Sequence, residues 1–140
     1  VARHARCLRD KCGAVIVRDQ LVIGAGYNAP PLDADDDALC LVELPPSDKP
    51  KSDRTCCVHA EWRAIMDAIQ STGEQLSGAT LYFTRVDSEG AILRSGRPYC
   101  TVCSRLALDA GIQFVALWHD EGIRVYPTDL YNRLSYGLSE

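Results

Sequence analysis

The chain has 140 residues, 46% of them hydrophobic and 24% charged, which is typical of a globular domain and excludes a disordered or collagen-like chain. The 15 Lys and Arg residues against 19 Asp and Glu give a net charge of −4, which argues against a protein that coats nucleic acid. No apolar run approaches the roughly 18 residues of a membrane-spanning helix, and the polar, Arg-rich start carries no secretory signal. We therefore expect a single domain over residues 1–140, located in the cytoplasm and without a membrane partner.

Seven cysteines are many for this length, and their odd number does not suit a framework of disulfides. Cys100 and Cys103 have the spacing of paired metal ligands. The sequence therefore favours a reduced, intracellular, metal-binding protein. For the remaining cysteines we prefer packing as small hydrophobic residues, with a second metal site as the alternative; they are Cys7, Cys12, Cys40, Cys56 and Cys57.

The first half of the chain predicts a helix end, a hairpin and a long loop. Ala2 to Lys11 has apolar residues near helical spacing, and Gly13 follows as a helix stop. The β-rich runs Ala14–Val17 and Leu21–Gly24 fit a hairpin with a short connection. Asp and Pro then dominate residues 30–55, which predicts a long acidic loop of the kind that forms a lid or a binding loop.

The second half alternates helices and strands. An apolar stripe predicts a helix over His59–Gln70, and similar spacing predicts another over Cys103–Ala110. Leu81–Thr84 and Phe114–Trp118 read as buried strands, with an irregular or hairpin excursion over 91–96. This alternation favours parallel strands joined by helical crossovers, and hence an α/β fold with helices on both faces of the sheet.

Glu61 is the first candidate for a functional side chain. It lies on the same face of its predicted helix as Ile65 and Ala68, and a carboxylate turned toward a core is costly unless it is paired or functional. The alternative is an exposed carboxylate that interacts with the helix dipole. Its place on the apolar face favours the functional interpretation.

His59, Cys100 and Cys103 are candidate zinc ligands because all three lie near predicted helix N-termini, where thiolates are stabilised. One imidazole and two thiolates leave a fourth tetrahedral position open, as in catalytic zinc sites. Zinc in such a site lowers the pKa of its bound water, and Glu61, two residues from His59, is placed to move the proton. The alternative is a structural zinc closed by a further cysteine, which leaves Glu61 without a role.

Two motifs together resemble a known superfamily. His59-Ala60-Glu61 followed by Pro98-Tyr99-Cys100-Thr101-Val102-Cys103 is similar to the signature of the cytidine and deoxycytidylate deaminases. Cys12–Val17 and Gly26–Asn28 resemble the first hairpin of the deoxycytidylate deaminase branch, so the likeness runs from about Arg3 to Trp118. The chain departs from the common pattern at three positions, which are Cys56, Arg63 and Tyr99.

The resemblance implies a three-layer α/β/α sandwich around a mixed five-stranded sheet. It also implies a Zn²⁺ centre with Glu61 as general acid and base and three ligands, His59, Cys100 and Cys103. For substrate contacts, the resemblance implies Asn28 and the Ala60 backbone. Tyr99 and His119 are further candidates from their places beside the second motif and after the last predicted strand.

The implied reaction is hydrolytic deamination of a cytosine ring in a small nucleoside or nucleotide, such as (deoxy)cytidine or its monophosphate. The first alternative is the same chemistry on a base in single-stranded DNA or RNA, for which Arg94, Arg97 and Arg105 are candidate backbone contacts. Others are a purine substrate (guanine or adenosine) and a non-catalytic zinc module. The net charge of −4 favours a small substrate over nucleic acid. The resemblance also implies a homo-oligomer.

Overall fold

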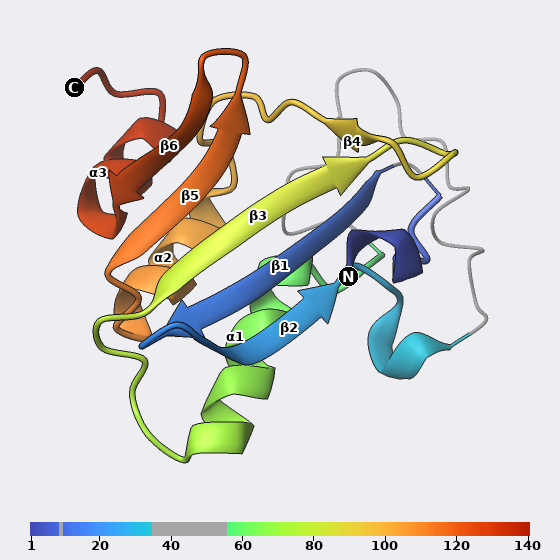
Figure 1. Cartoon of the computed structure of the whole chain (residues 1–140), viewed down its shortest axis with the longest axis horizontal. Helices are drawn as coiled ribbons and strands as arrows, with labels where there is room; N and C mark the ends of the chain where they lie inside the picture. The colour runs from blue at the N-terminus through green and yellow to red at the C-terminus, as the bar shows by residue number, and fades with distance from the viewer. Residues whose placement is uncertain (9, 35–55) are drawn as a thin grey trace.

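A mixed six-stranded sheet forms the centre of the computed structural model, which describes residues 1–8, 10–34 and 56–140 (Figure 1). The strand order is β2-β1-β3-β5-β6, and β4 pairs with the end of β3. β3 and β5 run parallel, and the other pairings are antiparallel. The strands are β1 (Lys11–Arg18), β2 (Leu21–Tyr27), β3 (Thr80–Val86), β4 (Ile92–Leu93), β5 (Phe114–His119) and β6 (Gly122–Pro127).

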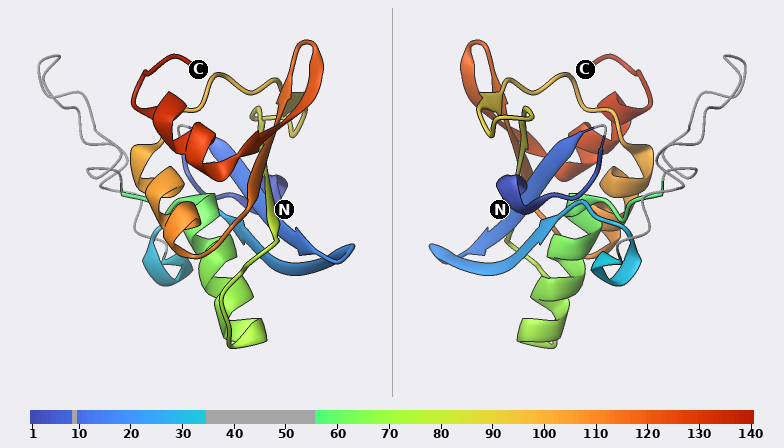
Figure 2. Two further views of the ribbon diagram at one scale, coloured as in Figure 1. Left: turned by 90° about the vertical axis from the view of Figure 1, so that its left-hand side faces the viewer. Right: turned by 90° about the vertical axis from the view of Figure 1, so that its right-hand side faces the viewer.

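Three α-helices lie together on one face of this sheet (Figure 2). They are α1 (Ala60–Thr72), α2 (Thr101–Asp109) and α3 (Thr128–Ser135). In the described part of the chain the other face carries one 3₁₀ turn, η1 (Ala2–His4), near the N-terminus (Figure 2). The α/β class and mixed sheet are therefore confirmed. The sheet has one strand more than expected, because the short β4 adds to β3, and the described α-helices cover one face rather than both.

The core lies between α1 and the middle of the sheet. Alternate residues of β1 and β3 point toward the helices, so Ile16 and Leu81 are fully buried there against Ile65 of α1. β2 presents Gly24 and Gly26 to α1, and a Cβ at Gly26 would lie 2.4 Å from the Ala64 nitrogen. These glycines let the helix backbone approach the sheet directly, which fixes the position of the helix N-terminus.

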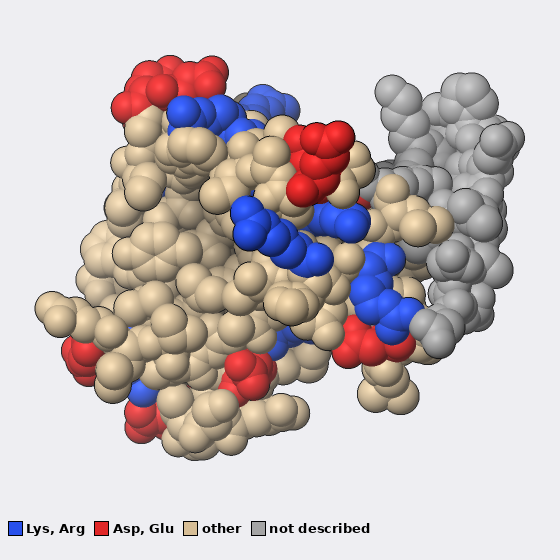
Figure 3. Space-filling view, turned by 45° about the vertical axis from the view of Figure 1, so that its right-hand side comes forward, with Lys and Arg blue, Asp and Glu red and all other residues tan. Residues whose placement is uncertain are grey.

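Charged side chains of both signs are mixed on the surface. Figure 3 shows Lys and Arg in small groups with Asp or Glu close by. Arg94 lies 3.8 Å from Asp120, and Arg85 lies 3.7 Å from Asp10. None of the helices in the described ranges is long and apolar enough to cross a membrane.

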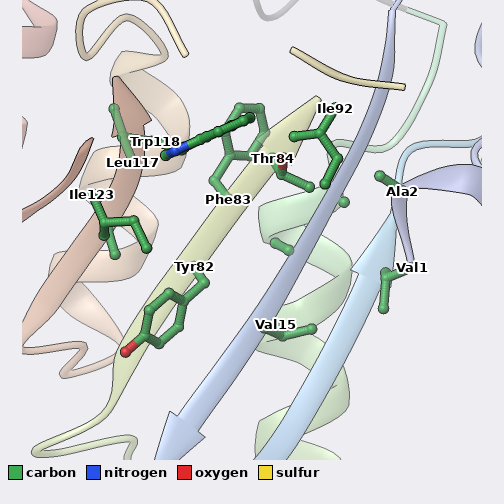
Figure 4. Close-up of a pocket in the computed structure, with 13 residues that line it drawn as sticks. Val1, Ala2, Val15, Tyr82, Phe83, Thr84, Ile92, Leu117, Trp118 and Ile123 are labelled. Carbon is green, nitrogen blue, oxygen red and sulfur yellow. The ribbon is translucent and has the colours of Figure 1, made fainter. Parts of the chain in front are cut away.

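The sheet face opposite the helices is apolar and hollowed (Figure 4). The hollow has a volume of about 420 Å³, and Val15, Tyr82, Trp118 and Ile123 are among the side chains that line it. Ile123 is 67% exposed there. The residues with predicted chemical roles do not line this hollow.

One predicted element is wrong and two were missed. The helix expected over Ala2–Lys11 is only the η1 turn, and Lys11 already belongs to β1, where it pairs with Val86 of β3. Gly13 is a strand residue whose missing Cβ admits the Ala2 backbone, because a Cβ there would lie 2.4 Å from the Ala2 nitrogen. β6 and α3 were not predicted. Of the expected loop, residues 35–55 lie outside the described residues, and Pro31–Asp33 form the 3₁₀ turn η2.

Candidate active site

The three predicted metal ligands come together where α1 and α2 begin. His59 is the N-cap residue of α1, and Cys100 is the N-cap residue of α2. His59 Nδ1 lies 3.2 Å from Cys103 Sγ and 3.5 Å from Cys100 Sγ. The three donor atoms lie within 4.8 Å of one another, so one imidazole and two sulfurs face a common point. This donor set fits zinc, which binds nitrogen and sulfur ligands and here would keep a fourth position open.

The start of α2 favours thiolates at both cysteines. The Cys103 backbone N–H donates to Cys100 Sγ over 3.2 Å, so the sulfur caps the helix. The positive end of the helix dipole stabilises negative charge at this position. The Cα atoms of Cys100 and Cys103 are 5.3 Å apart, so both sulfurs can reach one metal ion. Since zinc binds the thiolates, the reduced pair is the metal-binding form.

A short β-bridge connects the His59 segment to the end of the first hairpin. Val58 N donates to the Ala29 carbonyl over 2.8 Å, and Ala29 N donates back to the Val58 carbonyl over 3.4 Å. Asn28 precedes Ala29 and His59 follows Val58, so the antiparallel bridge places these two residues on facing segments. The bridge joins two residues that are 29 positions apart in the sequence.

Glu61 is buried in the first turn of α1, with 9% of its surface exposed. Burial raises the pKa of its carboxyl group to about 7, although a hydrogen bond with its own backbone acts in the opposite direction. Its negative charge also contributes to the raised pKa values of Cys12 and Tyr131, so both lie within electrostatic range. A carboxyl group with a pKa near neutrality is suited to both accept and donate a proton.

Asn28 is 8% exposed, and its side chain forms hydrogen bonds with the backbone at the beginning of β1. Its Oδ1 accepts from Cys12 N over 2.8 Å, and its Nδ2 donates to the Asp10 carbonyl over 2.7 Å. An amide has two N–H donors and two acceptor lone pairs, so capacity for a further partner is left. A contact from Asn28 to substrate stays a prediction.

The other predicted substrate contacts have different environments. Ala60 is fully buried as the first residue of α1, whereas Tyr99 is 70% exposed beside Cys100. His119 is half-buried: its Nε2 lies 2.7 Å from the Tyr126 hydroxyl, and its Nδ1 lies 3.1 Å from the Ser95 carbonyl. The substrate roles of these three residues also stay predictions.

Two features near Glu61 were missed by sequence reasoning. Tyr131 of α3 is buried, and its pKa is raised mainly by burial and then by the Glu61 charge. Cys12 of β1 is half-buried, and burial followed by the Glu61 charge raises its pKa to about 12, so it is a neutral thiol. The signal for α3 was the apolar spacing of Leu130, Tyr131 and Leu134.

Among the described cysteines outside the His59 group, Cys56 and Cys57 lie close together. Cys57 is 5% exposed, and its Sγ lies 3.7 Å from Cys56 Sγ. Within the described ranges, the one group of three metal-ligating side chains with mutual distances under 4.8 Å is the His59 group. Cys40 lies outside the described residues.

An α/β sheet with a His-Cys-Cys group that could hold zinc, and with a buried Glu two residues along the chain from that His, is the arrangement expected of a zinc-dependent hydrolytic enzyme. The chain belongs to the cytidine and deoxycytidylate deaminase family, because the family model of the zinc-binding region of these enzymes matches residues 1–118. It is accordingly a hydrolytic deaminase with zinc as its cofactor.

Individual relatives agree with this assignment. The deoxycytidylate deaminase of Mycobacterium phage D29 is 35% identical over 120 residues, which cover 81% of this chain and 82% of that protein. The fold is similar to that of the dCMP deaminase of cyanophage S-TIM5 solved with dCMP and dUMP (TM-score 0.53, 22% identity, 81% of this chain and 69% of that one). It is also similar to the cytidine deaminase of Burkholderia pseudomallei (TM-score 0.57, 17% identity, 91% of this chain and 82% of that one).

Proposed function

We propose that the protein converts dCMP and water to dUMP and ammonia. The observation that carries this proposal is the cluster of His59, Cys100 and Cys103, with the buried Glu61 two residues after His59 in the first turn of α1. The choice of a deoxynucleotide is supported by the 35% identity to a deoxycytidylate deaminase over most of both chains. In the reaction the water oxygen forms a bond to C4 of the cytosine ring, and the bond from C4 to the amino nitrogen breaks.

We propose that His59 Nδ1, Cys100 Sγ and Cys103 Sγ hold the zinc ion. Zinc bound by these three ligands supplies Lewis acidity at an open fourth position. The cysteines act as thiolates, and the α2 N-terminus stabilises their charge together with the Cys103 backbone N–H. His59 completes the donor set from the other helix.

Glu61 carries the protons in this scheme. It accepts a proton from the attacking water, donates one to N3 of the ring, and later delivers one to the amino group that leaves as ammonia. The pKa of about 7 that burial gives its carboxyl group matches both directions of transfer near neutral pH. Asn28 and the Ala60 backbone are proposed to contact the sugar and the base edge, and Tyr99 and His119 are proposed at the rim.

The mixed surface charge supports a small substrate over a nucleic acid. Proteins that hold single strands combine a basic groove with exposed aromatic side chains. Here the Arg94 guanidinium lies over the Trp118 ring, 3.2 Å from its centroid, and close to Asp120. This candidate for a nucleic-acid backbone contact therefore already has partners within the protein. The net charge of −4 acts in the same direction. We propose a homo-oligomer as well, which light scattering on the purified protein tests.

A substrate panel tests the proposal. Ammonia release is measured for the zinc-loaded protein with dCMP, deoxycytidine, CMP, cytidine, guanine, adenosine and a short DNA strand that contains one cytosine. We expect the highest kcat/KM for dCMP. Turnover of the DNA strand or of a purine in the absence of dCMP turnover would contradict the proposal. The variant Glu61→Gln serves as the matched control, because it keeps the size of the side chain and removes its acid–base function.

A further inference from the structure

Trp62 stacks directly on the imidazole ring of His59. The two ring centroids are 4.2 Å apart, and the ring planes differ by only 4°. The other ring pairs recorded for the described residues have centroids 5.9 to 6.2 Å apart and are tilted or edge-on. The two residues are three apart at the start of α1, where a helical side chain leans over the preceding turn. The indole therefore covers one face of the ring whose Nδ1 lies 3.2 Å from Cys103 Sγ.

The position of the indole is not set by a polar contact. Trp62 Nε1 is buried and has no hydrogen-bond partner in the part of the chain that the structure describes. A buried N–H without a partner is unfavourable, so the ring contact and apolar packing must outweigh it. What the site uses at position 62 is the flat aromatic face, and this property is shared by Phe but absent from Leu.

We propose that Trp62 is a positioning residue for the zinc centre. An imidazole ring is free to rotate about its terminal torsion, which is broad in isolated histidine. With the indole parallel to it, such rotation would break the stack, so Nδ1 stays directed at the two cysteine sulfurs. Side chains that orient a metal-ligating histidine contribute to metal affinity although they do not touch the metal. This inference rests on the zinc centre of the proposed function and is independent of the substrate.

Metal affinity tests the proposal without any substrate. Zinc dissociation constants are measured for the reduced protein by competition with a chromophoric chelator. We expect Trp62→Leu to weaken zinc binding about tenfold, within the range known for residues that orient metal ligands. Trp62→Phe keeps the aromatic face and is expected to stay within about threefold of the original protein. Ile65→Val is the matched control, since Ile65 is a buried α1 residue outside the donor group, and it leaves the affinity unchanged.

A spectroscopic measurement covers the case in which Trp62→Leu does not fold. The chain has two tryptophans, so Trp118→Phe leaves Trp62 as the single indole fluorophore. Titration of this variant with Co²⁺ is expected to quench the fluorescence, with an endpoint at one ion per chain. Unchanged fluorescence on metal binding would overturn the proposal, as would zinc affinity equal to that of the original protein in Trp62→Leu. Absence of dCMP turnover, by contrast, would count against the proposed substrate and leave the positioning role intact.

Discussion

Arg63 and Asp33 form a half-buried ion pair that ties the segment after Asn28 to α1. Arg63 Nη1 donates to Asp33 Oδ1 over 3.1 Å, and Nη2 donates to the Pro30 carbonyl over 3.0 Å. The Tyr27 hydroxyl lies 3.2 Å from Asp33 Oδ2, and the Arg63 guanidinium lies over the Tyr27 ring. Arg63 is therefore engaged within the protein, with 18% of its side chain exposed.

We predict that Arg63→Met lowers the free energy of unfolding by about 1 kcal/mol, because the pair is charged, hydrogen-bonded and only partly exposed. We also expect a higher KM for dCMP with a smaller change in kcat, since the pair positions the segment next to Asn28 rather than the reacting atoms. Denaturant titration and steady-state kinetics measure both effects. The double variant with Asp33→Asn closes a double-mutant cycle, and strictly additive effects would contradict the coupling.

The close approach of α1 to β2 predicts that alanine substitutions at two glycines differ sharply in their effect on stability. Gly26→Ala places a Cβ 2.4 Å from the Ala64 nitrogen and 2.5 Å from the Ala60 carbonyl oxygen, so backbone must move. We expect a loss of about 3 kcal/mol in the free energy of unfolding, together with weaker zinc binding, because Ala60 adjoins His59. Gly96→Ala is the control, since its Cβ meets no atom within 4 Å and Gly96 is exposed. Equal stability of the two variants in thermal and urea unfolding would refute this account of the packing.

The pKa of Glu61 predicts how the stability of the metal-free protein depends on pH. Its folded-state pKa of about 7 lies above the ordinary value of 4.5, so the fold favours the protonated carboxyl group. That contribution is complete below pH 4.5 and is lost as the pH rises through 7. Over this interval the loss amounts to about 3 kcal/mol. Urea unfolding of Glu61→Gln should lack this part of the pH dependence, and an unchanged pH profile would speak against the buried carboxyl group.

Removal of the metal is predicted to abolish activity reversibly. The donor set leaves the protein dependent on zinc for Lewis acidity, so a chelator is expected to stop ammonia release and added Zn²⁺ to restore it. A reductant is included throughout, because oxidation of Cys100 and Cys103 would remove both thiolates. Zinc analysis before and after each step provides the control. Full activity of a metal-free sample would be incompatible with the proposed centre.

Patterns within short stretches of the sequence were sufficient to predict the helices and strands that hold the candidate site. Apolar periodicity located α1, β3 and β5, and the two motifs named three candidate ligands that the structure brings together, His59, Cys100 and Cys103. The helix over Ala2–Lys11 was wrong because pairing of β1 with the distant β3 extends the strand to Lys11. Such pairing depends on residues about 75 positions away, which no local window contains.

The last two elements, β6 and α3, were harder to predict from local sequence patterns. β6 has Ile123 and Val125 exposed on the open face and Tyr126 buried on the other, so its burial pattern does not follow its hydrophobicity. α3 is only eight residues long and directly follows Pro127. The effect of the Glu61 charge on the pKa of Tyr131 depends on the packing of α3 against α2 and the sheet, and sequence spacing contains no information about it.

The kinetics of Glu61→Gln with dCMP test the central claim most directly. Glutamine fills the same space but cannot take a proton from water or return one to the ring and the leaving amine. We expect kcat to fall by about 10³-fold, a typical contribution of acid–base catalysis, while zinc stays bound at one ion per chain and the protein stays folded. A kcat within tenfold of the original value, with zinc bound, would contradict the role of Glu61 and with it the proposed reaction at this site.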